Sequence, residues 1–141
     1  MKKATALSLL AVGLTAGWLG FRSDYEFTTY PVDGCAQPVT AVTYWKVFHR
    51  GRWFSRGVAL VPGAYRTEEI PSRDCLILPK LSGFDAYFEA VLTCENGTIV
   101  ITSPSVLESP IPSTAIVSRR VDNGNYADLR AASGRNLIEL H

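Results

Sequence analysis

The sequence has 141 residues, of which 47% are hydrophobic and 19% are charged, and this composition is typical of one small folded domain rather than a disordered chain. The formal net charge is +1, and the segment after residue 21 holds 12 basic and 13 acidic residues, because two of the 14 basic residues are Lys2 and Lys3. Such a balance lacks the basic excess that neutralises phosphates, so we expect no nucleic-acid partner.

Residues 1–21 form either a membrane anchor or a signal peptide, because a basic start precedes an uncharged apolar run over residues 4–21. As a helix with a rise of 1.5 Å per residue, this run spans about 27 Å, which is just enough to cross a bilayer core. Small residues at 15–17 offer a cleavage site instead. We favour the anchor, because a cut after Gly17 leaves an apolar Trp-Leu-Gly-Phe start. Both interpretations place the rest of the chain outside the cytoplasm.

The segment that follows is rich in β-prone patterns. Residues 24–32 alternate between aromatic or β-branched residues and polar ones, and they predict a strand that ends at a Val-Asp-Gly turn. Residues 40–61 predict a hairpin with Gly51 in its turn. Residues 62–74 are mostly loop, and residues 75–78 are a short buried strand that ends at Pro79.

Residues 84–94 fit either a helix or a strand. Apolar residues recur at helical spacing, but alternate positions also separate into an apolar and a more polar face. The Asn96-Gly97 pair favours the strand, because it suits the type I′ turn of a hairpin. In that hairpin Leu92 lies opposite Ile101 and Cys94 lies opposite Ile99, so the apolar faces coincide.

The C-terminal third begins with a proline-rich stretch at 103–113, which predicts an extended connector or a sheet edge. One more strand is expected at 114–121, and then a short helix capped by Asn125 that ends near Gly134. The sequence therefore predicts a mainly β fold: a small antiparallel sheet, sandwich or partial barrel at 22–121, after one N-terminal hydrophobic helix at 1–21 and before a short C-terminal helix or tail at 122–141.

The sequence has three cysteines and two histidines, and these numbers limit the metal sites that it can form. They offer no workable set of zinc ligands, so we expect no metal and no cofactor. Outside the cytoplasm a disulfide is the natural interpretation. We predict a Cys75–Cys94 bridge, which closes a loop of about 20 residues worth about 3 kcal/mol and leaves Cys35 free. The alternative is that all three are reduced and buried.

Catalytic motifs of hydrolases, metalloproteases and phosphate-binding loops are absent from the sequence. We therefore assign no catalytic residues and expect a protein that is not an enzyme. The one unusual stretch is 44–56, where aromatic residues are interleaved with cations. A hairpin there could present an interaction surface, or its aromatic side chains could simply face the core. The candidate surface residues are Lys46, His49, Arg50, Arg52 and Arg56.

These observations lead to one expected function and two alternatives. We expect a non-enzymatic interaction or accessory subunit of a cell-envelope assembly, anchored in the inner membrane through residues 4–21, with its C-terminal domain on the periplasmic or extracellular side and another envelope protein as partner. The first alternative is a cleaved, secreted or periplasmic protein that binds a small ligand or a glycan. The second is a small hydrolase.

Overall fold

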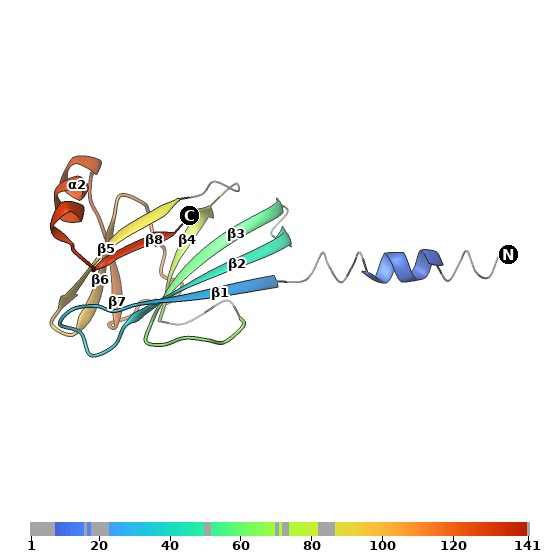
Figure 1. Ribbon diagram of the computed structural model, residues 1–141, viewed down its shortest axis with the longest axis horizontal. Coiled ribbons are helices and arrows are strands. Elements are labelled where there is room, and N and C mark those ends of the chain that lie inside the picture. Colours follow the sequence, from blue (N-terminus) through green and yellow to red (C-terminus); the bar gives the residue numbers. More distant parts are fainter. Residues whose placement is uncertain are drawn as a thin grey trace.

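The computed structural model describes residues 8–15, 17, 23–49, 52–69, 71, 74–81 and 87–140. The fold is mainly β, as the sequence predicts, and consists of two four-stranded sheets (Figure 1). Sheet A has the order β1-β2-β3-β4, and sheet B has the order β7-β6-β5-β8. The strands are β1 (Ser23–Tyr30), β2 (Val39–His49), β3 (Arg52–Pro62), β4 (Leu76–Leu81), β5 (Phe88–Glu95), β6 (Thr98–Ser103), β7 (Ile116–Arg120) and β8 (Leu137–Leu140).

Both predicted hairpins are present. Strands β2 and β3 pair antiparallel up to His49 opposite Arg52. Residues 88–95 form a strand rather than a helix, and Leu92 lies opposite Ile101 and Cys94 opposite Ile99, which confirms the predicted register. The turn between β5 and β6 has positive φ angles at Asn96 and Gly97, as a type I′ turn requires.

Strand β4 extends further than predicted, because it continues through Pro79 to Leu81. The pairing with β3 shifts register at this point: Val58 lies opposite Leu78, but Arg56 lies opposite Leu81. Since β4 is at the edge of sheet A and the proline lies in the bulge, the missing N–H does not end the strand.

The proline-rich connector allows β7 to pair parallel with β6, the one parallel pair of sheet B. Midway along it, Glu108 exchanges two backbone hydrogen bonds with Ile77 of β4, with N···O distances of 2.7 and 2.8 Å. The connector thus holds an edge of sheet A close to sheet B.

Helix α2 (Asn123–Ala132) confirms the predicted C-terminal helix, but its cap is Asp122 and not Asn125. The Asp122 carboxylate accepts a hydrogen bond from the Asn125 backbone N–H at 2.8 Å. Strand β8, which the sequence did not predict, follows the helix and pairs antiparallel with β5. In Figure 1, α2 lies beside sheet B.

The main core lies between the two sheets. Most of its members are apolar side chains at alternate positions of β2 to β8, and Val32 and Leu107 join them from loops. The largest members are fully buried: Phe88, Leu60, Leu76, Leu92, Ile99, Ile101, Ile116 and Ile138. Alternation places these residues on the inner faces of both sheets, as expected for a sandwich.

A second, smaller cluster covers the outer face of sheet A. Val42, Ala59, Val61 and Cys75 are buried there, with Tyr25, Phe27, Tyr65 and Ile77 packed against them. The ring of Tyr44 lies across Gly57, where a Cβ atom would come within 2.1 Å of a ring carbon. Glycine is therefore required at position 57 by the close approach of this ring.

A disulfide joins Cys35, in the loop after β1, to Cys94 of β5, with Cα atoms 5.5 Å apart. Cys75 is free and buried. The predicted Cys75–Cys94 bridge is therefore wrong. It assumed that the strand beginning near residue 75 pairs with the strand of Cys94, but β4 and β5 belong to different sheets. Cys75 belongs to the outer cluster of sheet A, whereas Cys94 packs against the main core.

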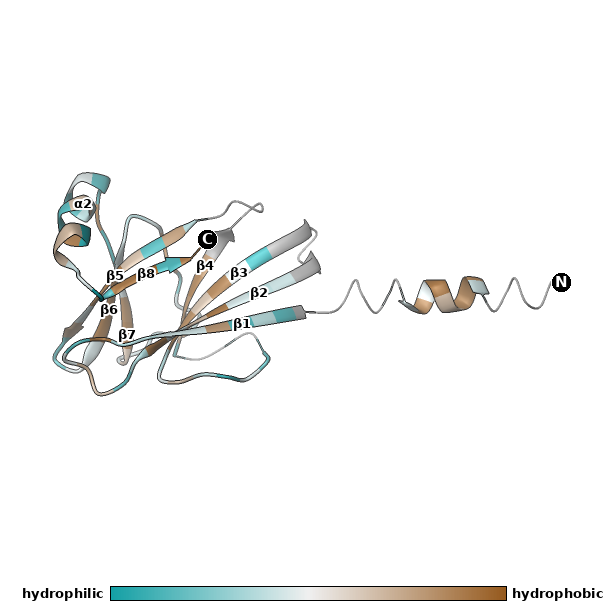
Figure 2. Cartoon of the chain, in the orientation of Figure 1, coloured by the Kyte–Doolittle hydropathy of each residue, from teal (hydrophilic) through white to brown (hydrophobic). Residues whose placement is uncertain are grey.

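The N-terminal helix, described at residues 8–15, stands apart from the two sheets in Figure 1. Its side chains are exposed, and the large apolar ones, which Figure 2 colours brown, keep 64–70% of their surface accessible: Leu9, Leu10, Val12 and Leu14. Among the described residues, no helix combines the length and apolar character needed to cross a bilayer.

Candidate functional site: a polar pocket between β1 and β8

A pocket of about 230 Å³ opens between the edge strands of the two sheets. Strand β1 is the edge of sheet A and β8 is the edge of sheet B on this side of the sandwich. The residues that line the pocket come from β1, β2, β3 and β8: Glu26, Thr28, Tyr30, Thr43, Arg56, Glu139 and Leu140. All but Leu140 carry a polar or charged group.

The polarity of this pocket is unusual for its position. Thr43 and Arg56 occupy the inner face of sheet A, which elsewhere supplies apolar residues to the main core. Their exposed fractions are only 3% and 9%. On the neighbouring strand, Glu26 lies directly opposite Thr43. The inner face of a sandwich is ordinarily apolar, and departures from such rules concentrate at functional sites.

Arg56 is the buried cation of the pocket. Its guanidinium carbon lies 5.3 Å from the centroid of the Trp45 ring, which is the residue opposite it on β2. This distance is within the range of a cation–π contact. Removing a guanidinium from water is costly unless hydrogen bonds and opposite charges compensate it. Its five N–H donors favour acceptors, whether these come from the protein or from a ligand.

Tyr30 connects β1 to β8 beside the pocket. Its hydroxyl donates to the backbone carbonyl of Glu139 at 3.3 Å. Burial, and then the nearby charge of Glu139, raise the pKa of the Tyr30 hydroxyl above its usual value. The hydroxyl therefore stays protonated near neutral pH, and it can donate or accept hydrogen bonds but cannot serve as a base.

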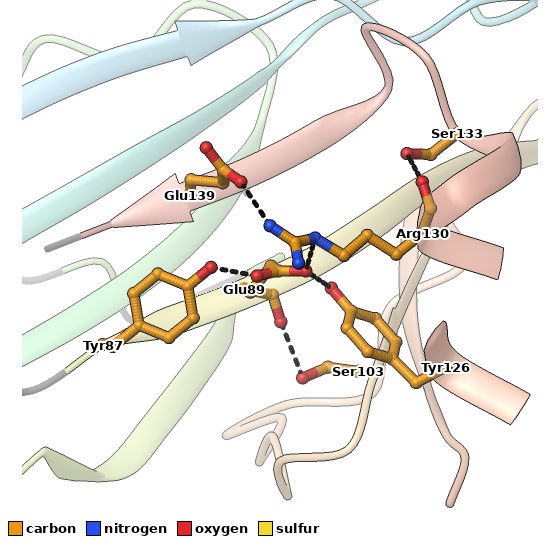
Figure 3. A network of polar contacts seen from close by, with 7 residues as sticks. All are labelled: Tyr87, Glu89, Ser103, Tyr126, Arg130, Ser133 and Glu139. Carbon is orange, nitrogen blue, oxygen red and sulfur yellow. Dashed lines mark hydrogen bonds and ion pairs between the residues drawn. The ribbon is translucent and has the colours of Figure 1, made fainter. Parts of the chain in front are cut away.

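Next to the pocket, Glu139 belongs to a polar network centred on Glu89 (Figure 3). These two glutamates lie directly opposite each other on β5 and β8, an arrangement in which like charges repel. Arg130 of α2 compensates the negative charge of both carboxylates, since its Nε lies 2.6 Å from Glu89 Oε1 and its Nη2 lies 3.1 Å from Glu139 Oε1. The helix thereby holds the carboxylate of a residue that lines the pocket.

Two tyrosines complete the network. The Tyr126 hydroxyl donates to Glu89 Oε1 at 2.9 Å, and the Tyr87 hydroxyl donates to the other carboxylate oxygen. Burial, and then the hydrogen bond to Glu89, raise the pKa of Tyr126. Glu89 is buried and accepts from three donors, so its carboxylate is fixed in place rather than poised to react with a substrate.

A separate set of contacts fixes the loop after β1. The Asp33 carboxylate accepts hydrogen bonds from Arg135 and from Asn136. These bonds lower the pKa of Asp33, with the bond from Arg135 contributing most. Together with the disulfide, they hold β1 against the segment that leads into β8.

The candidate hairpin surface is only partly described. Arg56 is buried at the pocket, so it does not belong to an exposed surface at the hairpin tip. Arg50 lies outside the described residues, and so do the side chains of Lys46, His49 and Arg52. For these four residues the interaction surface stays a prediction. Among the residues that the structure describes, no cluster of His, Cys, Asp and Glu could hold a metal ion.

The pocket residues on β1 were not predicted from the sequence. The signal was present, because alternation in residues 24–32 places Glu26, Thr28 and Tyr30 on one face and Tyr25 and Phe27 on the other. A polar face of this kind is ordinarily the solvent face of a strand. Here the aromatic face packs on the outer cluster of sheet A and the polar face points between the sheets. Only the pairing of β1 with β2 and the position of β8 reveal that the polar face, and not the aromatic face, points inward.

Comparison with protein-family models, with curated proteins and with solved structures finds no match for this chain.

Proposed function

We propose that this chain is a non-catalytic accessory subunit of a cell-envelope assembly. In this proposal residues 4–21 anchor it in the inner membrane, the β domain lies on the periplasmic or extracellular side, and another envelope protein is its partner. The observation that carries the proposal is the N-terminal helix, whose apolar side chains are exposed all round instead of packing on the domain. An apolar helix without a protein core to cover it is suited to a lipid environment.

The disulfide supports a location outside the cytoplasm. Cys35 and Cys94 are 59 residues apart in the sequence and are joined in the fold. Disulfides of this kind persist in oxidising compartments and are rare in the cytosol. Because the bridge ties the loop after β1 to sheet B, it stabilises a small domain that would otherwise depend on a modest core.

A pull-down tests this proposal. The full chain is purified from detergent-solubilised membranes after chemical cross-linking in cells, as wild type, as Leu10→Arg and as Leu10→Ile. An arginine in the middle of the apolar run costs roughly 2.5–3.5 kcal/mol of membrane insertion, whereas isoleucine costs almost nothing. We expect an envelope protein to co-purify with the wild type and Leu10→Ile, and not with Leu10→Arg. Equal recovery of the same partner with all three chains contradicts the role of the anchor.

The pocket favours a second candidate, a periplasmic or secreted protein that binds a small ligand or a glycan. Several polar groups line this concave site, and polar groups placed in a pocket fix the orientation of a bound ligand. Cleavage after residue 17 distinguishes this candidate from the first, since it removes the anchor and leaves the pocket intact.

A further inference from the structure

We propose that the pocket between β1 and β8 binds a carboxylated monosaccharide, such as a hexuronate, with the ligand carboxylate on Arg56 and the ligand hydroxyls on Glu26, Thr28 and Thr43. This inference rests on the second candidate function, the binding of a small ligand or glycan, and it names the class of ligand. It does not depend on whether the chain is anchored.

The position of Arg56 points to an anionic group on the ligand. Its side chain is 9% exposed and lines the pocket, whereas Glu26 on the edge strand is exposed. The buried part of the lining therefore carries the positive charge, whereas both carboxylates of the lining, Glu26 and Glu139, are exposed. The planar guanidinium matches the geometry of a carboxylate, and its five donors allow it to keep contacts within the protein while it binds a ligand.

The remaining walls point to hydroxyl groups on the ligand. Thr28, Tyr30 and Thr43 offer hydroxyls that both donate and accept, and Glu26 offers a carboxylate that accepts from hydroxyl donors. Glu26 and Thr43 lie opposite each other on neighbouring strands, about 5 Å apart. Acceptors and donors at this spacing suit the neighbouring hydroxyls of a sugar ring.

The size and composition of the pocket argue against other ligand classes. A volume of about 230 Å³ is below the range of drug-sized sites, which start at roughly 300 Å³, and it suits one monosaccharide. Leu140 is the one apolar residue that lines the pocket among the described residues, so an amino acid with an apolar side chain finds no apolar subsite.

Saturation-transfer NMR and calorimetric titration of the purified full chain test the proposal. The probes are D-glucuronate, D-galacturonate, D-glucose, acetate and glycine. Since a hydrogen bond to a charged group is strong, we expect one of the uronates to bind about tenfold or more tighter than glucose. Acetate should bind more weakly than the uronate, because it lacks the hydroxyls.

Variants assign the contacts. Arg56→Lys keeps the charge but loses the planar fork, and we expect uronate affinity to fall about tenfold. Glu26→Gln, at an exposed position, should lower affinity for both the uronate and glucose. Glu68→Gln is the matched control, because Glu68 is an exposed glutamate outside the pocket lining, and its affinity should equal that of the wild type.

Three results overturn the proposal: glucose binding as tightly as both uronates, glycine binding in preference to the uronates, or no binding of any sugar. If Arg56→Lys fails to fold, Glu26→Gln and Thr43→Val still test the proposal. Uronate affinity that is unchanged in both of these variants would mean that the ligand binds elsewhere. These titrations use purified protein, so their failure is separate from a failure of the membrane pull-down.

Discussion

We expect the hydrogen bond from Tyr126 of α2 to Glu89 of sheet B to contribute measurably to the free energy of unfolding. Tyr126 is 8% exposed, and its hydroxyl donates to the buried carboxylate of Glu89 at 2.9 Å. Tyr87 donates to the same carboxylate, but it is 48% exposed. Tyr126→Phe and Tyr87→Phe therefore delete the same chemical group against the same acceptor and differ in burial.

The expected magnitudes follow from access to water. A hydrogen bond to a charged group contributes about 1.5–3 kcal/mol, so Tyr126→Phe should lower the free energy of unfolding by about 2 kcal/mol, because water cannot replace the lost donor. Arg130 still contacts the same oxygen, so the carboxylate is not left isolated. At the exposed Tyr87, water replaces the hydroxyl, and the loss should be about 0.5 kcal/mol.

Urea denaturation followed by tryptophan fluorescence measures both variants at pH 7. Tyr126→Phe should lower the urea midpoint without changing the slope of free energy against urea, and its Tm should fall by roughly 8 °C. Equal losses in the two variants, or a loss below about 0.5 kcal/mol for Tyr126→Phe, would refute the assignment of Glu89 as a buried anchor for the helix.

Three other predictions concern the rest of the fold. Replacing both bridged cysteines with alanine should cost about 4 kcal/mol in the chain-entropy model for a separation of 59 residues, measured by denaturation, and non-reducing peptide mapping should recover Cys75 as the free thiol. Gly57→Ala should destabilise the domain by about 1–3 kcal/mol through a clash with the Tyr44 ring, and adding Tyr44→Ala should make the cost of Gly57→Ala markedly smaller; equal costs in both backgrounds would exclude the clash. The hydrogen bond from Arg135 is the main cause of the lowered pKa of Asp33, and this shift contributes stability that is present above the unfolded pKa and is lost as pH falls through the folded pKa. Asp33→Asn should therefore flatten the acid side of the profile of stability against pH, below about pH 4. An unchanged profile would contradict this.

The elements that the sequence predicts well are those with local signals. The Asn96-Gly97 turn and the alternation on either side of it specify the β5–β6 hairpin and its register, because both signals lie within a few residues. The helix after Asp122 is likewise found from its short-range pattern, although its cap is three residues earlier than predicted.

The features that the sequence does not reveal depend on contacts between distant segments. Strand β8 has only four residues, and its signal is too short to distinguish from a tail until β5 pairs with it. The disulfide partner of Cys94 depends on which sheet contains each strand, and nothing in the spacing of the three cysteines specifies that. The pocket depends on the inverted orientation of β1, because the same alternation fits either face of the strand.

The location and covalent state of the mature chain decide whether it is an anchored envelope subunit. Cells that express the full sequence are fractionated under conditions that block thiol exchange, and the intact mass of the chain is measured in each fraction. We predict a chain in the membrane fraction that retains residues 1–21 and carries one disulfide, between Cys35 and Cys94. A shorter chain that begins near Trp18 in the exported soluble fraction would replace the anchored subunit with the second candidate. A full-length chain in the cytoplasmic fraction, with Cys35 and Cys94 both reduced, would contradict both the anchor and the oxidising compartment.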